Sequence, residues 1–234
     1  MKNLILILTV SFSILSCTSK IEGESVATAK KEFKTGHFKN LDINCNCDVT
    51  IISSEISKVV AESHQNLIDN LEVVFNGKNL KIKEKRPVGE YDLYNVNIYT
   101  NPGLSKIKLS KQSKMKISGT LKSEKLKIEA KDQAFINQSY LDIQNLELDF
   151  SDQSNVNLSG TAINLNLNIA DESIADLSNL QTVKTEFNTD GNAMTTIHAL
   201  KDLSGKAIEN SKVFYLGDPN KNTTEKDKAI INKK

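Results

Sequence analysis

A repeat of about twenty residues runs through the second half of the chain and restricts what it can fold into. Short polar triplets begin at Asp132, Asp152 and Asp171, and a stretch of alternating apolar and polar residues follows each triplet. Residues two apart in a β-strand point to the same face, so each repeat carries one apolar face. Such a face is buried only when neighbouring repeats stack on it. We therefore predict an all-β fold in which a β-solenoid of about five turns begins near residue 104.

Apolar residues line up in four columns when the repeats are superposed at intervals of 19 to 21 residues. The columns are Leu109, Ile128, Leu148, Leu167, Phe187 and Ile208; Ile107, Leu126, Leu146 and Leu165; Met115, Ile136, Val156 and Ala175; and Ile117, Leu158, Leu177 and Ile197. Gln138 and Thr185 interrupt the columns, and we interpret both as imperfect repeats. Parallel crossovers between strands are right-handed by strong preference, so the expected solenoid is like a right-handed β-helix.

The region before the repeats has a different pattern. Short runs of β-forming residues, bounded by Asn, Gly, Ser or Pro, lie between Phe38 and Thr100. The sequence Asn-Gly-Lys-Asn at 76–79 separates two of these runs and predicts a hairpin turn. Residues 66–70 are compatible with one helical turn. We expect short strands and hairpins in this half of the chain.

Both ends of the chain have compositions unlike the middle. Residues 1–16 combine a positive start with an apolar run that is too short to span a bilayer, which is typical of a secretory signal peptide. The run ends in Ile-Leu-Ser-Cys, which resembles the lipobox of bacterial lipoproteins and implies a lipid on Cys17. Residues 17–37 are interpreted as the lipidated N-terminus and a tether, and the Lys-rich residues 220–234 as a disordered tail. Thr18, rather than Asp, follows the Cys, which by resemblance to lipoprotein sorting rules favours the outer membrane.

The basic residues are almost all lysines. The chain has 30 Lys and Arg residues, of which only Arg86 is Arg, and it has no Trp. Arginine supplies the planar fork that recognises phosphate and carboxylate groups bidentately, whereas Lys is a hydrated point charge. This composition argues against a nucleic-acid partner and against a sugar site built by aromatic stacking.

Cys45 and Cys47 are separated by one residue. On a strand they would point to one face, where a disulfide requires strained geometry. A metal site would require further ligands with suitable spacing, and the three His residues are scattered. We expect two half-buried thiols, with a strained redox disulfide as the alternative.

The acidic residues of the turns raise the question of a cation site. Asp132, Asp152, Asp171 and Asp190 recur with the period of the repeat. They are weak candidates for Ca²⁺, which takes six to eight oxygen ligands. The Gly-rich pattern of calcium-binding solenoids is missing, and Asp side chains also cap turns through bonds to the backbone. We favour turn capping, and we expect neither a metal nor a cofactor.

Charge is unevenly distributed along the repeats. Residues 104–131 contain nine Lys and two Glu, a net charge of +7, whereas residues 132–200 contain ten acidic residues and one Lys, a net charge of −9. The candidate interaction surface consists of Lys106, Lys108, Lys114, Lys116, Lys125 and Lys127. It would contact an anionic glycan, a lipid headgroup or the acidic end of a second copy. The alternative is an evenly solvated surface with local pairs such as Lys127 and Glu147, each worth less than about 1 kcal/mol.

The order of these features resembles a known family. A lipobox, then "FKNLDINCNCDVTII", "NLKIKE" and "YNVNIYTNPGLSKIKLS", and finally polar-turn repeats that end in "VFYLGDP" are similar to the head GIN domain of auto-transporter adhesins, over residues 38–219. The resemblance implies β-helix-like stacks and adhesion at the bacterial surface, to a glycan or a protein. It implies no catalytic residue. We therefore predict a lipid-anchored, non-catalytic module of the cell envelope. The alternatives are a scaffold that faces the periplasm and, third, a polysaccharide-active β-helix enzyme.

Overall fold

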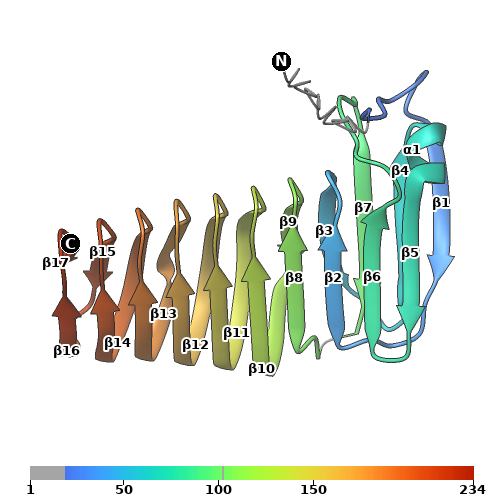
Figure 1. Ribbon diagram of the computed structural model, residues 1–234. Coiled ribbons are helices and arrows are strands. Elements are labelled where there is room, and N and C mark those ends of the chain that lie inside the picture. Colours follow the sequence, from blue (N-terminus) through green and yellow to red (C-terminus); the bar gives the residue numbers. More distant parts are fainter. Residues whose placement is uncertain (1–18, 102) are drawn as a thin grey trace, which may run out of the picture.

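The computed structural model describes residues 19–101 and 103–234. The predicted signal peptide, residues 1–16, and Cys17 lie outside the described residues. The described chain is nearly all β, as the alternating sequence pattern predicts. Figure 1 shows a long stack of strands that begins with an irregular group of elements at the N-terminal end and continues to the C-terminus.

The N-terminal region contains seven strands and one short helix. These are β1 (Ala29–Lys34), β2 (Asn40–Asn44), β3 (Asp48–Ser53), β4 (Lys58–Ser63), α1 (Gln65–Asn70), β5 (Leu71–Asn76), β6 (Asn79–Glu84) and β7 (Tyr94–Thr100). The repeat region contains β8 (Lys106–Ser110), β9 (Lys114–Ser118), β10 (Thr120–Ala130), β11 (Phe135–Phe150), β12 (Asn155–Ile169), β13 (Ile174–Thr189), β14 (Met194–Ala207), β15 (Lys212–Leu216), β16 (Asn220–Glu225) and β17 (Ile230–Lys233).

Two faces of the stack run the length of the molecule. We call them face I and face II. Face I passes through β6, β2, β8, the C-terminal parts of β10 to β14, and β16. Face II passes through β7, β3, β9, the N-terminal parts of β11 to β14, β15 and β17. All of these pairings are parallel, and the apolar side chains between the two faces form one core.

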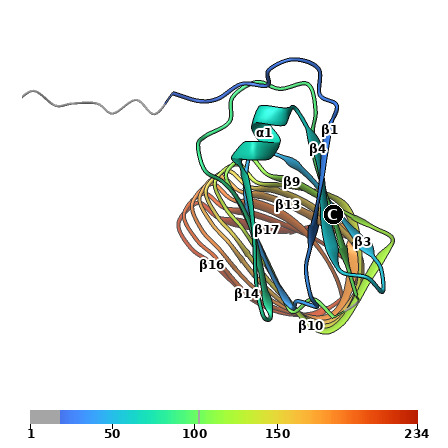
Figure 2. The ribbon, with the colours of Figure 1, turned by 90° about the vertical axis from the view of Figure 1, so that its right-hand side faces the viewer.

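The N-terminal elements close one end of the stack, and we call residues 19–100 the cap. Here β1 pairs with β4, β4 with β7, and β5 with β6, all antiparallel. The hairpin predicted at 76–79 is confirmed, with Gly77 in the left-handed region at φ +58°. Figure 2 views the molecule from this end and shows α1 above the strands. The predicted helical turn is therefore also present, as α1.

The repeat register confirms most of the predicted columns. Met115, Ile136, Val156 and Ala175 stack on one another, as do Leu126, Leu146 and Leu165, with Thr185 next in line. Two assignments are wrong. Ile128 pairs with Ile107 rather than Leu109, and Phe187 pairs with Gly205 rather than standing in line with Ile208. Both errors have one physical reason, because a period of two leaves register ambiguous when adjacent inward positions are both apolar or when a turn changes length.

Two predictions about the ends of the chain are also wrong. Residues 220–234, predicted as a disordered tail, form β16 and β17, which complete another turn, and Ala229 and Ile231 are buried in it. Residues 17–37 were predicted to include a tether, but β1 lies in this range and pairs along its whole length with β4. The apolar residues of β17 continue the inward column of β15. β1 adds a strand to the edge that β4 provides.

Cys45 and Cys47 form a disulfide bond, which is the alternative to the two half-buried thiols that the sequence favours. They lie at the corner between β2 and β3, where the chain leaves one face and enters the other. Both side chains are fully buried. The corner brings the Cα atoms of the two residues to 5.4 Å.

Candidate functional site

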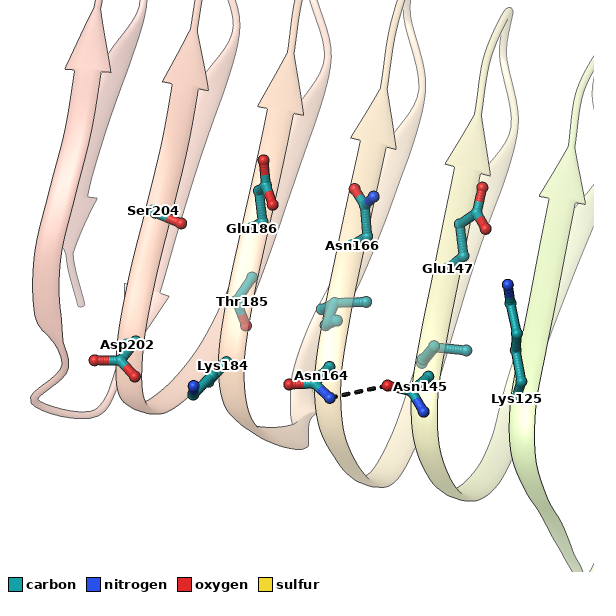
Figure 3. A pocket seen from close by; sticks show the side chains of 12 residues that line it. Lys125, Asn145, Glu147, Asn164, Asn166, Lys184, Thr185, Glu186, Asp202 and Ser204 are labelled. Carbon is teal, nitrogen blue, oxygen red and sulfur yellow. Dashed lines mark hydrogen bonds between the residues drawn. The ribbon is translucent and has the colours of Figure 1, made fainter.

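A groove runs across five strands of face I and is the candidate functional site (Figure 3). It has a volume of about 420 Å³. Its lining residues are Lys125 of β10, Asn145, Leu146 and Glu147 of β11, Asn164, Leu165 and Asn166 of β12, Lys184, Thr185 and Glu186 of β13, and Asp202 and Ser204 of β14. No aromatic side chain lines it.

The lining side chains form two rows, because the strands are parallel and in register. The first row is Lys125, Asn145, Asn164, Lys184 and Asp202, and the second, two residues further along each strand, begins at Glu147 and continues with Asn166, Glu186 and Ser204. Neighbouring strands lie about 4.8 Å apart. The first row therefore extends about 19 Å across five strands and the second about 14 Å across four, and each row presents one polar group per strand.

Part of this lining is held by hydrogen bonds between neighbouring strands. Asn164 donates to the side-chain oxygen of Asn145 at 2.9 Å, and Figure 3 shows this bond in the lower row. Thr185, which replaces Leu in an inward column, is buried, and its hydroxyl bonds the hydroxyl of Thr182. Thr182 in turn donates to the carbonyl of His198 at 2.9 Å. The floor of the groove thus has a fixed shape, while the charged ends of Lys184 and Glu186 face solvent.

The structure does not bring the six predicted lysines together on one surface. Lys106, Lys108 and Lys127 lie on face I, in ion pairs. Lys125 lies at the end of the groove, in the row next to Lys127. Lys114 and Lys116 are on β9, on face II, beside a separate hollow of about 390 Å³. None of Lys114, Lys116 and Lys125 forms an ion pair with another residue of 19–101 or 103–234.

The paired lysines join the basic and acidic repeats to each other. Lys127 of β10 contacts Glu147 and Asp149 of β11, and also Glu129 on its own strand. The hydrogen bonds that Lys127 donates to Asp149 and Glu147 raise the pKa of its ammonium above the ordinary 10.5. The reversal of charge between residues 131 and 132 therefore places opposite charges on adjacent strands. Lys106, Lys108 and Lys127 thus link adjacent turns through ion pairs.

Glu129 has a second role in this network. It accepts bonds from Lys106 and Lys108 of β8. Burial raises the pKa of the Glu129 carboxyl, but the bonds from Lys106 and Lys108 outweigh burial, so that its pKa lies below the ordinary 4.5.

Asp132, Asp152 and Asp171 occupy the same corner of three successive repeats. Asp132, Asp152 and Asp171 all have φ +61°, in the left-handed region that Asp tolerates better than most residues. The carboxylate of each accepts a hydrogen bond from the backbone N–H of the corresponding residue one turn earlier. These bonds are Lys111 N–H to Asp132 at 2.7 Å, Asp132 N–H to Asp152 at 3.0 Å and Asp152 N–H to Asp171 at 3.0 Å. The capping therefore joins successive turns and is not confined to one turn.

Asp190 does not belong to this column. Gly191 occupies the equivalent position, with φ +66°, and the column continues through Glu209 and Asp227. The sequence spacing misled us because Asp190 precedes the left-handed position by one residue. No group of three or more His, Cys, Asp or Glu side chains within the described ranges is arranged to hold a metal ion.

The described residues contain no helix that is long and apolar enough to cross a bilayer. The sequence profile of a family described as "Putative auto-transporter adhesin, head GIN domain" matches residues 37–219. The chain belongs to this family. A search of curated protein sequences gives no match.

Solved structures share the fold of this GIN-family chain. A putative adhesin from Bacteroides fragilis NCTC 9343 superposes with a TM-score of 0.80 at 17% sequence identity, over 91% of this chain and 98% of the other. A putative lipid binding protein from Parabacteroides distasonis ATCC 8503 gives a TM-score of 0.75 at 16% identity, over 92% and 99% of the two chains. A putative adhesin from Parabacteroides merdae ATCC 43184 gives 0.67 at 15% identity, over 92% and 98%. At these identities the likeness establishes the fold.

The groove residues were not singled out from the sequence. A signal was available, because Asn145, Asn164, Lys184 and Asp202 recur with the period of the repeat at an outward position. The amide, ammonium and carboxylate groups along the groove can donate and accept hydrogen bonds at about 4.8 Å intervals. This arrangement suits an extended ligand better than a compact one.

Proposed function

We propose that this GIN-family protein is a lipid-anchored, non-catalytic module of the outer membrane that binds an extended polysaccharide along the groove of face I. The observation that supports the proposal most strongly is the pair of polar rows, which place hydrogen-bonding groups on five consecutive strands in the first row and on four in the second. A polymer of sugar units offers hydroxyl groups at regular intervals, which such rows can match. The family supports an adhesin-like role at the cell surface or envelope.

A polysaccharide is favoured over a protein ligand by the chemistry of the lining. Protein interfaces depend on buried aromatic and apolar anchors at their centre. The groove has no aromatic lining, and the leucines in it belong to the inward columns of the core. Its exposed groups are amides, carboxylates and ammonium groups, which bind hydroxyl groups by direct hydrogen bonds.

The binding test uses residues 18–234, which include every residue that the structure describes. The fragment is applied to an array of bacterial and host polysaccharides and matrix proteins, at low and at high salt. The proposal requires a polysaccharide ligand whose affinity falls at least about tenfold when Asn164→Ala and Glu186→Ala are combined, since each lost hydrogen bond is worth about 1 kcal/mol. A matched control replaces Asn155 and Lys212, two exposed residues of face II, by Ala.

The outcomes separate the alternatives. Ligand binding that the control substitutions weaken and the groove substitutions do not would move the site to face II. Retention of a matrix protein alone would favour a protein ligand. New reducing ends or unsaturated products after incubation with polysaccharides would show an enzyme. Salt dependence indicates whether Lys125 and Lys184 contact an acidic sugar, because screening weakens exposed charge pairs.

The lipid anchor and the location need separate tests. Incorporation of a labelled fatty acid that Cys17→Ala abolishes would show the lipid. Protease treatment of intact cells then distinguishes a surface-exposed module, which is degraded, from a periplasm-facing scaffold, which is protected until the outer membrane is opened.

A further inference from the structure

The N-terminal segment after the proposed lipid site is fixed to the cap. We call residues 19–25 the strap. Ile21 N–H donates to the carbonyl of Pro87 at 2.9 Å, and Gly89 N–H donates to the carbonyl of Ile21 at 2.8 Å. Gly23 N–H donates to the carbonyl of Glu90 at 2.9 Å. The strap therefore runs as an added strand along residues 87–90, between β6 and β7.

Side chains of the cap reinforce these backbone bonds. Asn66 of α1 donates to the carbonyl of Glu22 at 2.6 Å and accepts from the N–H of Glu24 at 3.2 Å. Arg86, the single arginine of the chain, contacts both the carbonyl and the hydroxyl of Ser19 at 3.4 Å. Ser19, which Arg86 contacts, is two positions after the proposed lipid site at Cys17.

His64 closes the other end of the strap. Its ring is buried, and Nδ1 lies 2.9 Å from the carbonyl of Ser25 and 3.1 Å from that of Glu24. Two carbonyls can only accept, so Nδ1 carries the proton and Nε2 accepts from the N–H of Asp92 at 3.4 Å. Gly23 passes directly over this ring, since a Cβ there would come within 2.4 Å of it. The strap therefore packs closely against the cap, and at position 23 there is no room for a side chain.

We infer that the cap is held against the bilayer surface without a spacer, and that the repeats point away from it. The inference rests on the lipid at Cys17 proposed above. Only Thr18 lies between Cys17 and Ser19, so the Cα atoms of Cys17 and Ser19 are at most about 7 Å apart. A free tether over residues 17–37 would reach about 70 Å. Because the strap is docked on the cap, the chain cannot extend over nearly all of this distance. The cap therefore contacts the headgroup layer of the membrane.

Charge favours the upright arrangement over one in which the stack lies flat. In Figure 1 the strap and the turns between β8 and β9 and their successors lie along the same edge of the molecule. That edge carries the carboxylates of Asp132, Asp152, Asp171 and Glu172. Bacterial and other membranes that contain anionic lipids repel such an edge. The far turn, at β16, is eight strand steps from β6 and would stand about 38 Å further out.

Docking of the strap is tested first without a membrane. In residues 18–234, the amides of Ile21 and Gly23 should exchange hydrogen slowly, as the surrounding strands do. Asn66→Ala should speed exchange at both amides by about tenfold, the value expected for lost hydrogen bonds. The control, Gln65→Ala, removes only a bond to Asp69 within the same helix and should leave strap exchange unchanged. Rapid exchange in the unaltered fragment would overturn the inference, whatever the state of Cys17.

Position at the membrane is tested on the full lipidated chain in phosphatidylethanolamine–phosphatidylglycerol vesicles that contain a lipid with a nitroxide on its headgroup. A fluorophore is placed through Glu90→Cys on the cap or Asn222→Cys on β16. Strong quenching at 90 and weak quenching at 222 is expected. Insertion of about twenty Gly and Ser residues between Thr18 and Ser19 should remove the quenching at 90. Weak quenching at both sites would show a loose cap, and strong quenching at both would show a stack that lies flat; either result overturns the inference. Absence of fatty-acid label instead refutes the proposed anchor and leaves the strap result standing.

Discussion

The cap and the repeat region reach stability by different routes. In the repeat region, the same backbone bond recurs at the corner of successive turns, where an N–H donates to a carbonyl of the preceding turn, as Gln133 N–H does to Lys111 and Gln153 N–H does to Asp132. In the cap, each contact occurs once, as with the bond from Asn46 N–H to Glu84 at 2.7 Å. Similar side chains therefore have equivalent surroundings from one turn of the repeats to the next, whereas each side chain of the cap has surroundings of its own.

The two regions are joined where β2 and β3 of the cap pair with β8 and β9, and at the corner between these strands. Cys47 of the cap accepts a backbone bond from Lys114, just as Ser113 accepts one from Phe135 and Ala134 accepts one from Asn155. Cys47 is therefore the first member of a buried column of small residues that continues along the stack. Glu84, whose side chain is almost fully buried, also bridges the regions through Lys111 at 3.2 Å. The repeats are templated on this corner.

The largest expected effect comes from close backbone contact in the repeat region. Gly160 has φ +113°, and a Cβ there would lie 1.9 Å from the carbonyl oxygen of Leu141 on the neighbouring strand. Gly160→Ala should cost at least about 3 kcal/mol, because the strands must move apart. Gly77 of the cap has φ +58° with nothing within 4 Å of its Cβ position, so Gly77→Ala should cost about 1 kcal/mol. Urea unfolding measures both. Equal losses would show that the repeats are not packed more tightly than the cap hairpin.

The next prediction concerns the column of left-handed turn residues. Asp152→Ala removes the acceptor for Asp132 N–H and places Ala at φ +61°. It should cost about 2 kcal/mol, the sum of a lost bond and the left-handed penalty. Asp152→Gly should cost about 1 kcal/mol, because Gly tolerates this conformation. Thermal unfolding with and without Ca²⁺ checks both variants. A large stabilisation by Ca²⁺ that Asp152→Ala abolishes would replace capping by a cation site.

The fold of the repeat region is more predictable from the sequence than the fold of the cap. In the repeats, alternation and period place Met115, Ile136, Val156 and Ala175 in one column, because stacking imposes one rule on every turn. In the cap, the strap is held by the backbone carbonyls of Pro87 and Glu90. Every residue has a backbone carbonyl, so no pattern of residue types predicts these contacts. The last turn was missed because its outward residues are Lys-rich, although Ala229 and Ile231 repeat the pattern of Ser211 and Val213 at an interval of 18.

The candidate site was less predictable than the fold, for a related reason. Outward residues are constrained by neighbours on adjacent strands rather than by a shared core. Six lysines could be assigned to outward positions, but the partners of Lys106, Lys108 and Lys127 depend on the register of β8 to β11. A shift of two residues in the pairing of β8 with β10, from Ile107 to Leu109 opposite Ile128, is enough to exchange these partners. The groove needed the true register before its two rows could be recognised.

The third prediction concerns the disulfide of the cap, because Cys47 lies at the corner position that Ser113 occupies in the first repeat. The double substitution Cys45→Ala and Cys47→Ser removes the bond and supplies the small residue that Ser113 supplies one turn later. Closing a loop this short is worth about 1.6 kcal/mol in the chain-entropy account, so the loss should be near that value. Differential scanning calorimetry should show a fall of about 3 to 6 °C at this chain length. Treatment of the unaltered protein with a reductant after brief unfolding should give the same shift, and a much larger loss would mean that the cap corner cannot be replaced by a repeat corner.

The smallest effect should come from the ion pairs that link the basic and acidic turns, and it should depend on pH. Glu129 has a folded pKa below 4.5, since the bonds from Lys106 and Lys108 outweigh burial. A lowered folded pKa means that the carboxylate stabilises the fold fully above the unfolded value and loses this contribution as the pH falls through the folded value. Glu129→Gln should therefore be less stable than the unaltered protein at pH 7 and equal to it once the pH is below the folded pKa. Chemical unfolding at several pH values measures the difference. The exposed pair of Lys122 and Asp142 is the control, because Lys122→Ala should change stability by less than about 0.5 kcal/mol. Equal effects of the two substitutions at pH 7 would mean that the charge reversal contributes nothing to the joining of the turns.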